Sequence, residues 1–449
     1  MGPRGPRLAA AVLVSSCSLL AACTSSRSAA SPSGPGSAVP TTASSPVRPL
    51  SLPPPTTGRE SARAVQARLC RRPRAPQATR ARPGPVPSVI RRVEREVQAV
   101  RGLRYLHPVA VHPVTHAQLV RGLNRSFDHS YPRGLYVRRG RAWQVIGVIP
   151  RSVNLRDALH AFLSTQVAGY YDPTTGQLVF VGSSHPSPAQ RLALAHELTH
   201  ADDDQHFDLS RINRLENRCR DEQDMAALGA VEGSAQFFMF EVARRFLSLG
   251  DALSMLFQGG GAPPAGVPPF LQTLLLWPYV DGVRFVAALD ARGGLTEVNR
   301  AIRRLPVSTE QVIHPDAYPS DRPRTVEVPD LGPRLGAGWR DLDVMDVGEA
   351  WLDAMLRPAG TLGAAAAGFP DPATGWDGGQ YRAWTDGPHV AVVLQTAWDS
   401  RTAAAAFAAK AARWIGGRRD AEVGRLGSNV TVLFGSDAGT LRRLRAALT

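Results

Sequence analysis

Residues 196–200 read His-Glu-Leu-Thr-His, which is the pattern H-E-x-x-H. On a helix, residues four apart lie on one face, so the imidazoles of His196 and His200 can reach the same metal ion. Glu197 is rotated from that face and is expected to lie beside the open coordination position, where its carboxylate can take a proton from zinc-bound water. The sequence therefore predicts a Zn²⁺ site with His196 and His200 as ligands and Glu197 as the catalytic base.

A third protein ligand is needed, and two residues compete for this role. His206 fits the longer pattern H-E-x-x-H-x-x-G-x-x-H, but Asp203 stands where that pattern has the glycine that lets the chain turn back. Glu232 follows His200 by 32 residues and precedes the small residues 233–235, which permit close helix approach at a metal site. We favour Glu232 and keep His206 as the alternative. Two weaker candidates are Asp224 and Glu241.

The elements around these residues are expected to be two helices and a β-hairpin. Residues 188–204 and 223–247 have helical patterns, and the first helix carries the apolar side chains that would bury it against a sheet: Leu192, Leu194, Ala195 and Leu198. Residues 167–181 place two apolar stretches around an Asp-Pro-Thr-Thr-Gly turn. We expect this hairpin to supply an edge strand along which an extended substrate backbone can lie.

The rest of the chain predicts a mixture of helices and strands. Helices are expected at 87–101 and 155–167, and a strand at 136–149. Residues 319–375 are expected to form loops with one alanine-rich helical stretch. The final segment predicts a small sheet with helices, since strands are expected at 381–384, 390–395 and 430–434, and helices at 403–415 and 438–448.

The N-terminus has the features of an exported, lipid-anchored protein. Arg4 and Arg7 precede a mostly apolar run at 8–20, which is too short to span a bilayer. Leu-Ala-Ala-Cys then ends at Cys23 and resembles the bacterial lipobox, so we predict a signal peptide at 1–22 and lipidation of Cys23. An ordinary secretory signal is the alternative. Residues 23–58 are rich in Ser, Pro and Ala and are expected to form a flexible stalk.

Composition agrees with a location on the extracytoplasmic face of the cell membrane. The net charge is +14, but only one of the 52 basic residues is a lysine, so we expect no nucleic acid partner. The expected partners are a protein or peptide substrate at the cell surface and the membrane itself, through the lipid anchor. After removal of 1–22 and acylation of Cys23, Cys70 and Cys219 remain. In an oxidising compartment we expect them to form a disulfide, with two unpaired thiols as the alternative.

Residues 167–235 resemble an uncharacterised bacterial group of gluzincin-like (HExxH … EGxA) zinc metallopeptidases. The resemblance rests on Gly-Tyr-Tyr-Asp-Pro at 169–173, Ala-His-Glu-Leu-Thr-His at 195–200, and Val-Glu-Gly-x-Ala at 231–235. Weaker similarities follow at 314–318 and 376–381. Members often carry Asp where this chain has Ser234. If that Asp orients a zinc ligand, this chain has weaker support for the ligand at that position.

The resemblance implies an α+β fold, with a zincin-like catalytic domain and a small C-terminal α/β unit. It also implies peptide-bond hydrolysis, Glu232 as the third ligand, and a His or Tyr at the oxyanion, for which His314 and Tyr318 are candidates. We expect an N-terminal region at 59–150, the metallopeptidase domain at 151–318 and the C-terminal region at 319–449. The competing hypothesis is a non-catalytic, zinc-stabilised surface lipoprotein that binds a cell-envelope partner, but a structural zinc site has no use for Glu197.

Overall fold

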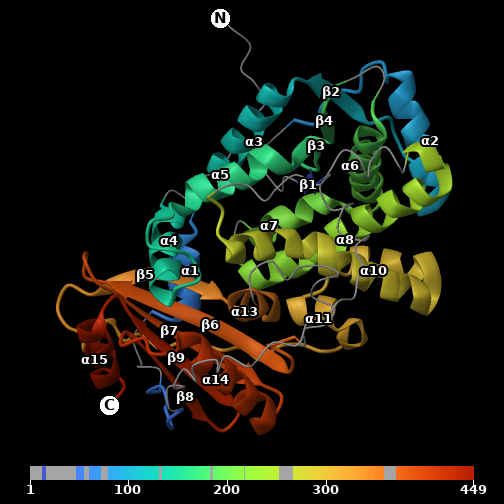
Figure 1. Ribbon diagram of the computed structural model, residues 1–449. Coiled ribbons are helices and arrows are strands. Elements are labelled where there is room, and N and C mark those ends of the chain that lie inside the picture. Colours follow the sequence, from blue (N-terminus) through green and yellow to red (C-terminus); the bar gives the residue numbers. More distant parts are fainter. Residues whose placement is uncertain are drawn as a thin grey trace, which may run out of the picture.

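Figure 1 shows the computed structural model of the chain. It describes residues 13–16, 47–54, 60–71, 79–130, 134–182, 186–216, 218–251, 266–357 and 371–449. Helices and strands both contribute, which confirms the predicted mixed α+β class. The predicted lipidation site Cys23, most of the stalk and the alanine-rich stretch near residue 365 lie outside the described residues.

A four-stranded sheet lies in the N-terminal half of the molecule, in the order β1-β3-β4-β2. Its strands are β1 (Leu13–Ser16), β2 (Ala110–Val114), β3 (Val167–Asp172) and β4 (Gln177–Val181). β3 and β4 are antiparallel, with Gly169 opposite Phe180, which confirms the predicted hairpin. In its turn, the Asp172 carboxylate accepts hydrogen bonds from the Thr174 amide at 2.9 Å and the Thr175 hydroxyl at 2.7 Å.

Helices pack against this sheet and fill the space between it and the C-terminal part of the chain (Figure 1). They are α1 (Ala62–Leu69), α2 (Ser88–Arg101), α3 (His116–Ser130), α4 (Leu135–Ile146), α5 (Leu155–Gln166), α6 (Pro188–Phe207), α7 (Ile212–Glu216), α8 (Asp221–Phe246), α10 (Pro269–Arg303) and α11 (Thr309–Ile313). Short 3₁₀ turns lie at Leu209–Arg211 and Pro315–Ala317. α2, α5, α6 and α8 confirm the helices predicted near these positions.

Helix α6 starts with a capping box and packs on the hairpin. The Ser187 hydroxyl accepts from the Gln190 amide, and the Gln190 side chain accepts from the Ser187 amide, so two otherwise unpaired amides are satisfied. The predicted apolar face of the helix, represented by Leu192 and Leu198, joins one buried cluster with Leu178 of β4. This packing fixes the H-E-x-x-H segment against β3.

The C-terminal part is a five-stranded antiparallel sheet in the order β5-β6-β7-β9-β8. Its strands are β5 (Arg340–Asp346), β6 (Trp376–Thr385), β7 (Val390–Trp398), β8 (Ala421–Leu426) and β9 (Asn429–Gly435). The associated helices are α12 (Gly332–Leu335), α13 (Glu349–Leu356), α14 (Arg401–Ile415) and α15 (Ala438–Ala446).

The two faces of this sheet have different partners. Val392 of β7 joins a core cluster that includes Trp143 of α4 and Phe407 of α14. The neighbouring Val393 points to the opposite face and joins a cluster with Leu441 of α15. Because α4 contributes to the core of the sheet, the helical part and the C-terminal sheet share hydrophobic packing.

The strand predicted at 136–149 is wrong, because these residues form helix α4. Glycines in the left-handed conformation bound the helix, Gly134 with φ 81° and Gly147 with φ 100°. Side chains are buried on several sides of α4, because it packs against both α5 and the C-terminal sheet. The resulting apolar pattern is broad and in part resembles the alternation of a strand.

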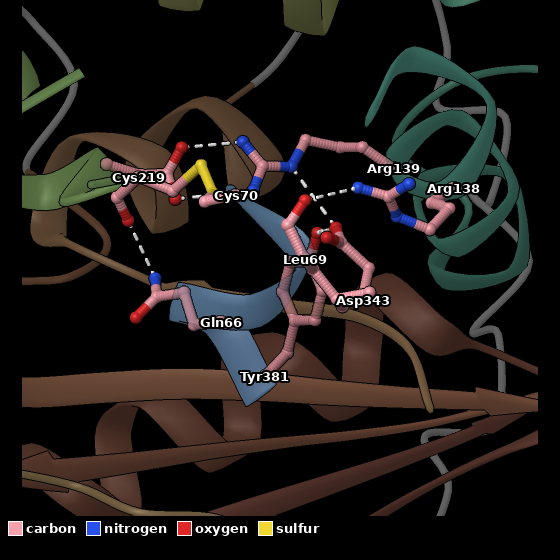
Figure 2. Close-up of a disulfide and its surroundings, with 9 residues drawn as sticks. Gln66, Leu69, Cys70, Arg138, Arg139, Cys219, Asp343 and Tyr381 are labelled. Atoms are coloured by element: carbon pink, nitrogen blue, oxygen red, sulfur yellow. Dashed lines mark hydrogen bonds and ion pairs between the residues drawn. A yellow bond between two sulfur atoms is a disulfide. The ribbon is translucent and has the colours of Figure 1, made fainter. Parts of the chain in front are cut away.

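A disulfide joins Cys70 to Cys219, as predicted (Figure 2). The Gln66 side-chain amide donates to the Cys219 carbonyl at 2.7 Å, and the Arg138 guanidinium donates to the Leu69 carbonyl at 3.0 Å. The covalent bond therefore ties α1 to the segment that leads into α8, across 149 residues of sequence.

Beside the disulfide, Arg139 links three parts of the structure (Figure 2). Its guanidinium binds Asp221 at the start of α8 at 2.5 Å and Asp343 of β5 at 3.1 Å. The Tyr381 hydroxyl of β6 donates to the same Asp343 carboxylate. A charged, buried network thus fixes α4 and α8 to the C-terminal sheet.

Next to this network, Glu222 is buried at the start of α8. Its Oε1 accepts hydrogen bonds from the amide of Thr309, at 2.5 Å, and from the hydroxyl of the same residue, at 2.8 Å. Burial raises the pKa of Glu222 to about 7, although the Thr309 hydrogen bonds oppose this change.

A pH-dependent loss of stability is expected from this residue. The folded chain holds the Glu222 proton above the ordinary pKa of 4.5, so the stabilisation is complete below that value and is lost as pH rises through about 7. The free energy of unfolding of Glu222→Gln is expected to fall less between pH 5 and pH 8 than that of the wild type, by up to about 3 kcal/mol. Denaturant unfolding at both pH values measures this, with Glu241→Gln as the surface control. Equal pH slopes in all three proteins would contradict the expectation.

Candidate metal centre

Two helices bring three potential metal ligands together. α6 carries His196 and His200 one turn apart, and α8 crosses it so that Glu232 faces both imidazoles. Both histidines are fully buried, and Glu232 is 3% exposed. The Nε2 atom of His196 lies 3.1 Å from both Glu232 Oε2 and His200 Nε2, and His200 Nε2 lies 3.4 Å from Glu232 Oε2.

This triangle of atoms has the dimensions of a zinc site. Ligand atoms bound at about 2.0–2.1 Å in a tetrahedron lie about 3.3 Å from each other. The two imidazole nitrogens also face one another and a carboxylate oxygen, an arrangement that a shared cation stabilises. The donor set, two histidines and one glutamate, is one that catalytic zinc sites use.

The protonation states that a metal requires are favoured by the surroundings. Burial lowers the pKa of His196, so that its ring is neutral near neutral pH. Burial acts to raise the pKa of Glu232, but the adjacent imidazoles of His200 and His196 lower it by a larger amount. The net change in this pKa is therefore downward. A neutral imidazole and an ionised carboxylate are the forms that bind a cation.

Glu197 of α6 faces strand β3. Its Oε2 accepts a hydrogen bond from the Tyr171 backbone amide of β3 at 2.7 Å. The side chain is fully buried and also lines a small hollow with Gly169 of β3 and Phe180 of β4. The backbone of β3 therefore orients the carboxylate that the sequence predicts to be the base.

The crossing of α8 and α10 depends on glycines. A Cβ atom on Gly233 would lie 2.2 Å from the Gly282 carbonyl oxygen, and one on Gly282 would lie 2.1 Å from the Gly229 carbonyl oxygen. The predicted close helix approach beside Glu232 is therefore confirmed. It also places the ring of Tyr279 of α10 against His196, with centroids 6.1 Å apart.

Gly233→Ala is expected to separate the two helices and to weaken the metal site. Overpacking against a backbone carbonyl outweighs the better helix propensity of alanine, so the free energy of unfolding should fall by about 2 kcal/mol or more. Denaturant unfolding and zinc titration of the variant measure both effects. Gly417→Ala is the control, because a Cβ there meets nothing within 4 Å. Wild-type stability and zinc affinity in Gly233→Ala would contradict this packing.

The alternative ligand His206 lies away from the triad. Its Nε2 is 2.8 Å from the Arg104 carbonyl oxygen and 3.6 Å from the Asp202 carboxylate. Glu241 is near the surface and pairs with Arg244, and Asp224 lines a separate cavity. Of the four candidates for the third ligand, the structure places only Glu232 with the two histidines.

Neither of the two residues considered for the oxyanion is paired with the triad. The imidazole of His314 is 3.0 Å from a Glu349 carboxylate oxygen of α13. The Tyr318 hydroxyl donates to the Arg304 carbonyl at 2.6 Å, which commits its proton to the main chain. Tyr279 is the aromatic residue that the structure adds to the surroundings of His196, and no spacing in the sequence signals it.

The residues after the H-E-x-x-H segment support the helices rather than the ligands. Asp203 accepts from Arg101 at 2.8 Å and from the Ser234 hydroxyl at 2.9 Å, all three being fully buried. Ser234 therefore joins α8 to α6 through Asp203. Asp204 accepts from the Tyr171 hydroxyl at 2.8 Å and from the Leu209 amide at 2.9 Å, so it closes the end of α6 onto β3.

Comparison with known proteins gives one match. A family model described as "Domain of unknown function (DUF8575)" matches residues 340–445, which contain the C-terminal sheet from β5 to β9 with α13, α14 and most of α15. The searches of curated proteins and of solved structures gave no match. Within the described residues, no helix has the length and hydropathy needed to cross a membrane.

Proposed function

We propose that the protein is a zinc metallopeptidase of zincin-like fold that hydrolyses peptide bonds. The observation that carries this proposal is the convergence of His196, His200 and Glu232, with Glu197 adjacent in sequence and oriented by β3. The resemblance of residues 167–235 to gluzincin-like peptidases supports it. A structural zinc site is usually closed by four protein ligands, and it has no use for an oriented carboxylate that is not itself a ligand.

The chain's own residues suit this chemistry. A zinc ion at the triad would supply a Lewis acid that polarises the scissile carbonyl and acidifies water. Glu197 takes the proton from the attacking water and returns it to the departing amine, which requires the fixed orientation that the Tyr171 amide provides. Burial of the triad increases the strength of every electrostatic interaction there.

The outer edge of β3 is suited to hold the substrate backbone. β1 pairs antiparallel with β3 along this edge, with Leu13 opposite Tyr171 and Val14 opposite Tyr170. Residues 13–16 belong to the predicted signal peptide, so its removal frees the edge. An extended peptide paired in the same way would pass beside Glu197, whose carboxylate binds the Tyr171 amide.

The proposal is tested by incubating zinc-loaded protein with a peptide library and mapping new termini by mass spectrometry. Reproducible cleavage at defined peptide bonds is the expected result. Full zinc occupancy without cleavage of any library member would instead favour a zinc-stabilised lipoprotein that binds a cell-envelope partner.

We also propose that the chain is anchored by lipid at Cys23, on the extracytoplasmic face of the cell membrane. Cys23→Ala removes the thiol that the lipid needs, so the protein should leave the membrane fraction or accumulate unprocessed. Fractionation and mass spectrometry of the N-terminus measure this. Cys17→Ala is the matched control and should fractionate as the wild type does. Membrane association of Cys23→Ala equal to that of the wild type would contradict the anchor.

A further inference from the structure

A second group of potential metal ligands lies between the helical part and the C-terminal sheet. It consists of His314, Glu349 and Asp371, which we call the junction cluster. The ligand atoms of these three side chains all lie within 4.8 Å of one another. His314 follows α11, Glu349 is the first residue of α13, and Asp371 precedes β6. In Figure 1, α11 and α13 lie between the α8–α10 pair and this sheet.

Glu349 is the buried member of the cluster. Its side chain is fully buried, and Oε1 lies 3.0 Å from the His314 Nε2 atom. Its other oxygen, Oε2, is buried and receives no hydrogen bond from the part of the chain that the structure describes. A buried carboxylate oxygen without a donor costs free energy unless a proton or a cation satisfies it.

The surroundings of the cluster are acidic. Burial, and then the neighbouring Asp371, Glu310 and Glu222, raise the pKa of Glu349 well above its usual range. Two arginines of this region form ion pairs outside the cluster, Arg324 with Asp377 and Arg357 with Asp353. Several acidic side chains therefore lie near one another at the junction, and His314 is the ion-pair partner of Glu349 among the described residues.

We propose that the junction cluster is a second, structural metal site, which binds a divalent transition-metal ion such as Zn²⁺ or Mn²⁺. One imidazole and two carboxylates form a donor set that suits these ions. The ion replaces the missing donor to Glu349 Oε2 and neutralises part of the local charge. It also joins α11, α13 and the segment leading into β6, so it fastens the helical part to the C-terminal sheet.

This site is distinct from the proposed catalytic site, and metal counting separates the two. Wild-type protein, freed of metal with a chelator, reloaded with Zn²⁺ and desalted, should contain two ions per chain. Asp371→Asn and His314→Ala should each contain one, as should the double variant of His196 and His200 to alanine. His389→Ala is the control, because its imidazole pairs with Asp386 at the surface and it should retain two ions.

Thermal unfolding gives a second readout that does not depend on peptidase activity. Reloading with Zn²⁺ or Mn²⁺ should raise the melting temperature of the double histidine variant, in which only the junction cluster remains, and this gain should disappear when Asp371→Asn is added. The test leaves the fully buried Glu349 unchanged, so it does not depend on a substitution that could disturb folding at that position. A double histidine variant that binds no metal would overturn the proposal and indicate that Glu349 is simply protonated. If the triad binds no zinc but the junction cluster does, the wild type should contain one ion per chain, and Asp371→Asn should remove it.

Discussion

Glu197→Gln is expected to lower peptide hydrolysis by several orders of magnitude while zinc content and melting temperature stay close to those of the wild type. The carboxamide has nearly the same shape and its oxygen can still accept the Tyr171 amide, so the local structure is retained. It cannot take a proton from water, however, and general-base catalysis is lost. Initial rates on a library peptide, compared at equal zinc occupancy, measure the effect.

The matched control is Glu241→Gln, a neutral substitution on the surface of α8, which should leave the rate unchanged. A Glu197→Gln protein that cleaves at more than about a tenth of the wild-type rate would show that another group is the base.

Replacing a triad member is expected to remove zinc. His200→Ala and Glu232→Ala each delete one of three buried ligands and leave the other two facing an incomplete site, so zinc affinity should fall by several orders of magnitude. Metal analysis of the purified variants, after equilibration with a weak competing chelator, measures the loss. In a background carrying Asp371→Asn, the junction cluster does not contribute to the count.

His206→Ala is the informative comparison for these variants. Its imidazole binds the Arg104 carbonyl instead of the triad, so this variant should retain zinc. The opposite pattern, with zinc lost in His206→Ala and retained in Glu232→Ala, would mean that the chain follows the H-E-x-x-H-x-x-G-x-x-H arrangement.

The sequence was informative where one local pattern determines the structure. H-E-x-x-H on a capped helix, and two apolar stretches around Asp-Pro-Thr-Thr-Gly, are local features, and both the helix and the hairpin were predicted. The small residues after Glu232 also predicted the close approach of another helix, since any Cβ at Gly233 meets the opposite backbone.

Other features depend on contacts that the sequence does not reveal. Strand β5 lies in a segment that the sequence predicts to form loops. Its Asp343 is charged but buried, which breaks the expected strand pattern, and the compensating Arg139 is 204 residues away in the sequence. The hydrogen bond from the Tyr171 amide to Glu197 is a backbone contact, and no side-chain pattern encodes it. The junction cluster joins residues from three separate elements, so only the fold brings them together.

Metal removal and restoration test the central claim most directly. The protein is treated with a chelator until no zinc remains, and cleavage of one library peptide is measured before treatment, after treatment and after zinc is returned. We predict that cleavage disappears with the metal and returns to its first value, and that Glu197→Gln remains inactive throughout. Cleavage by the metal-free protein at the untreated rate would contradict the account.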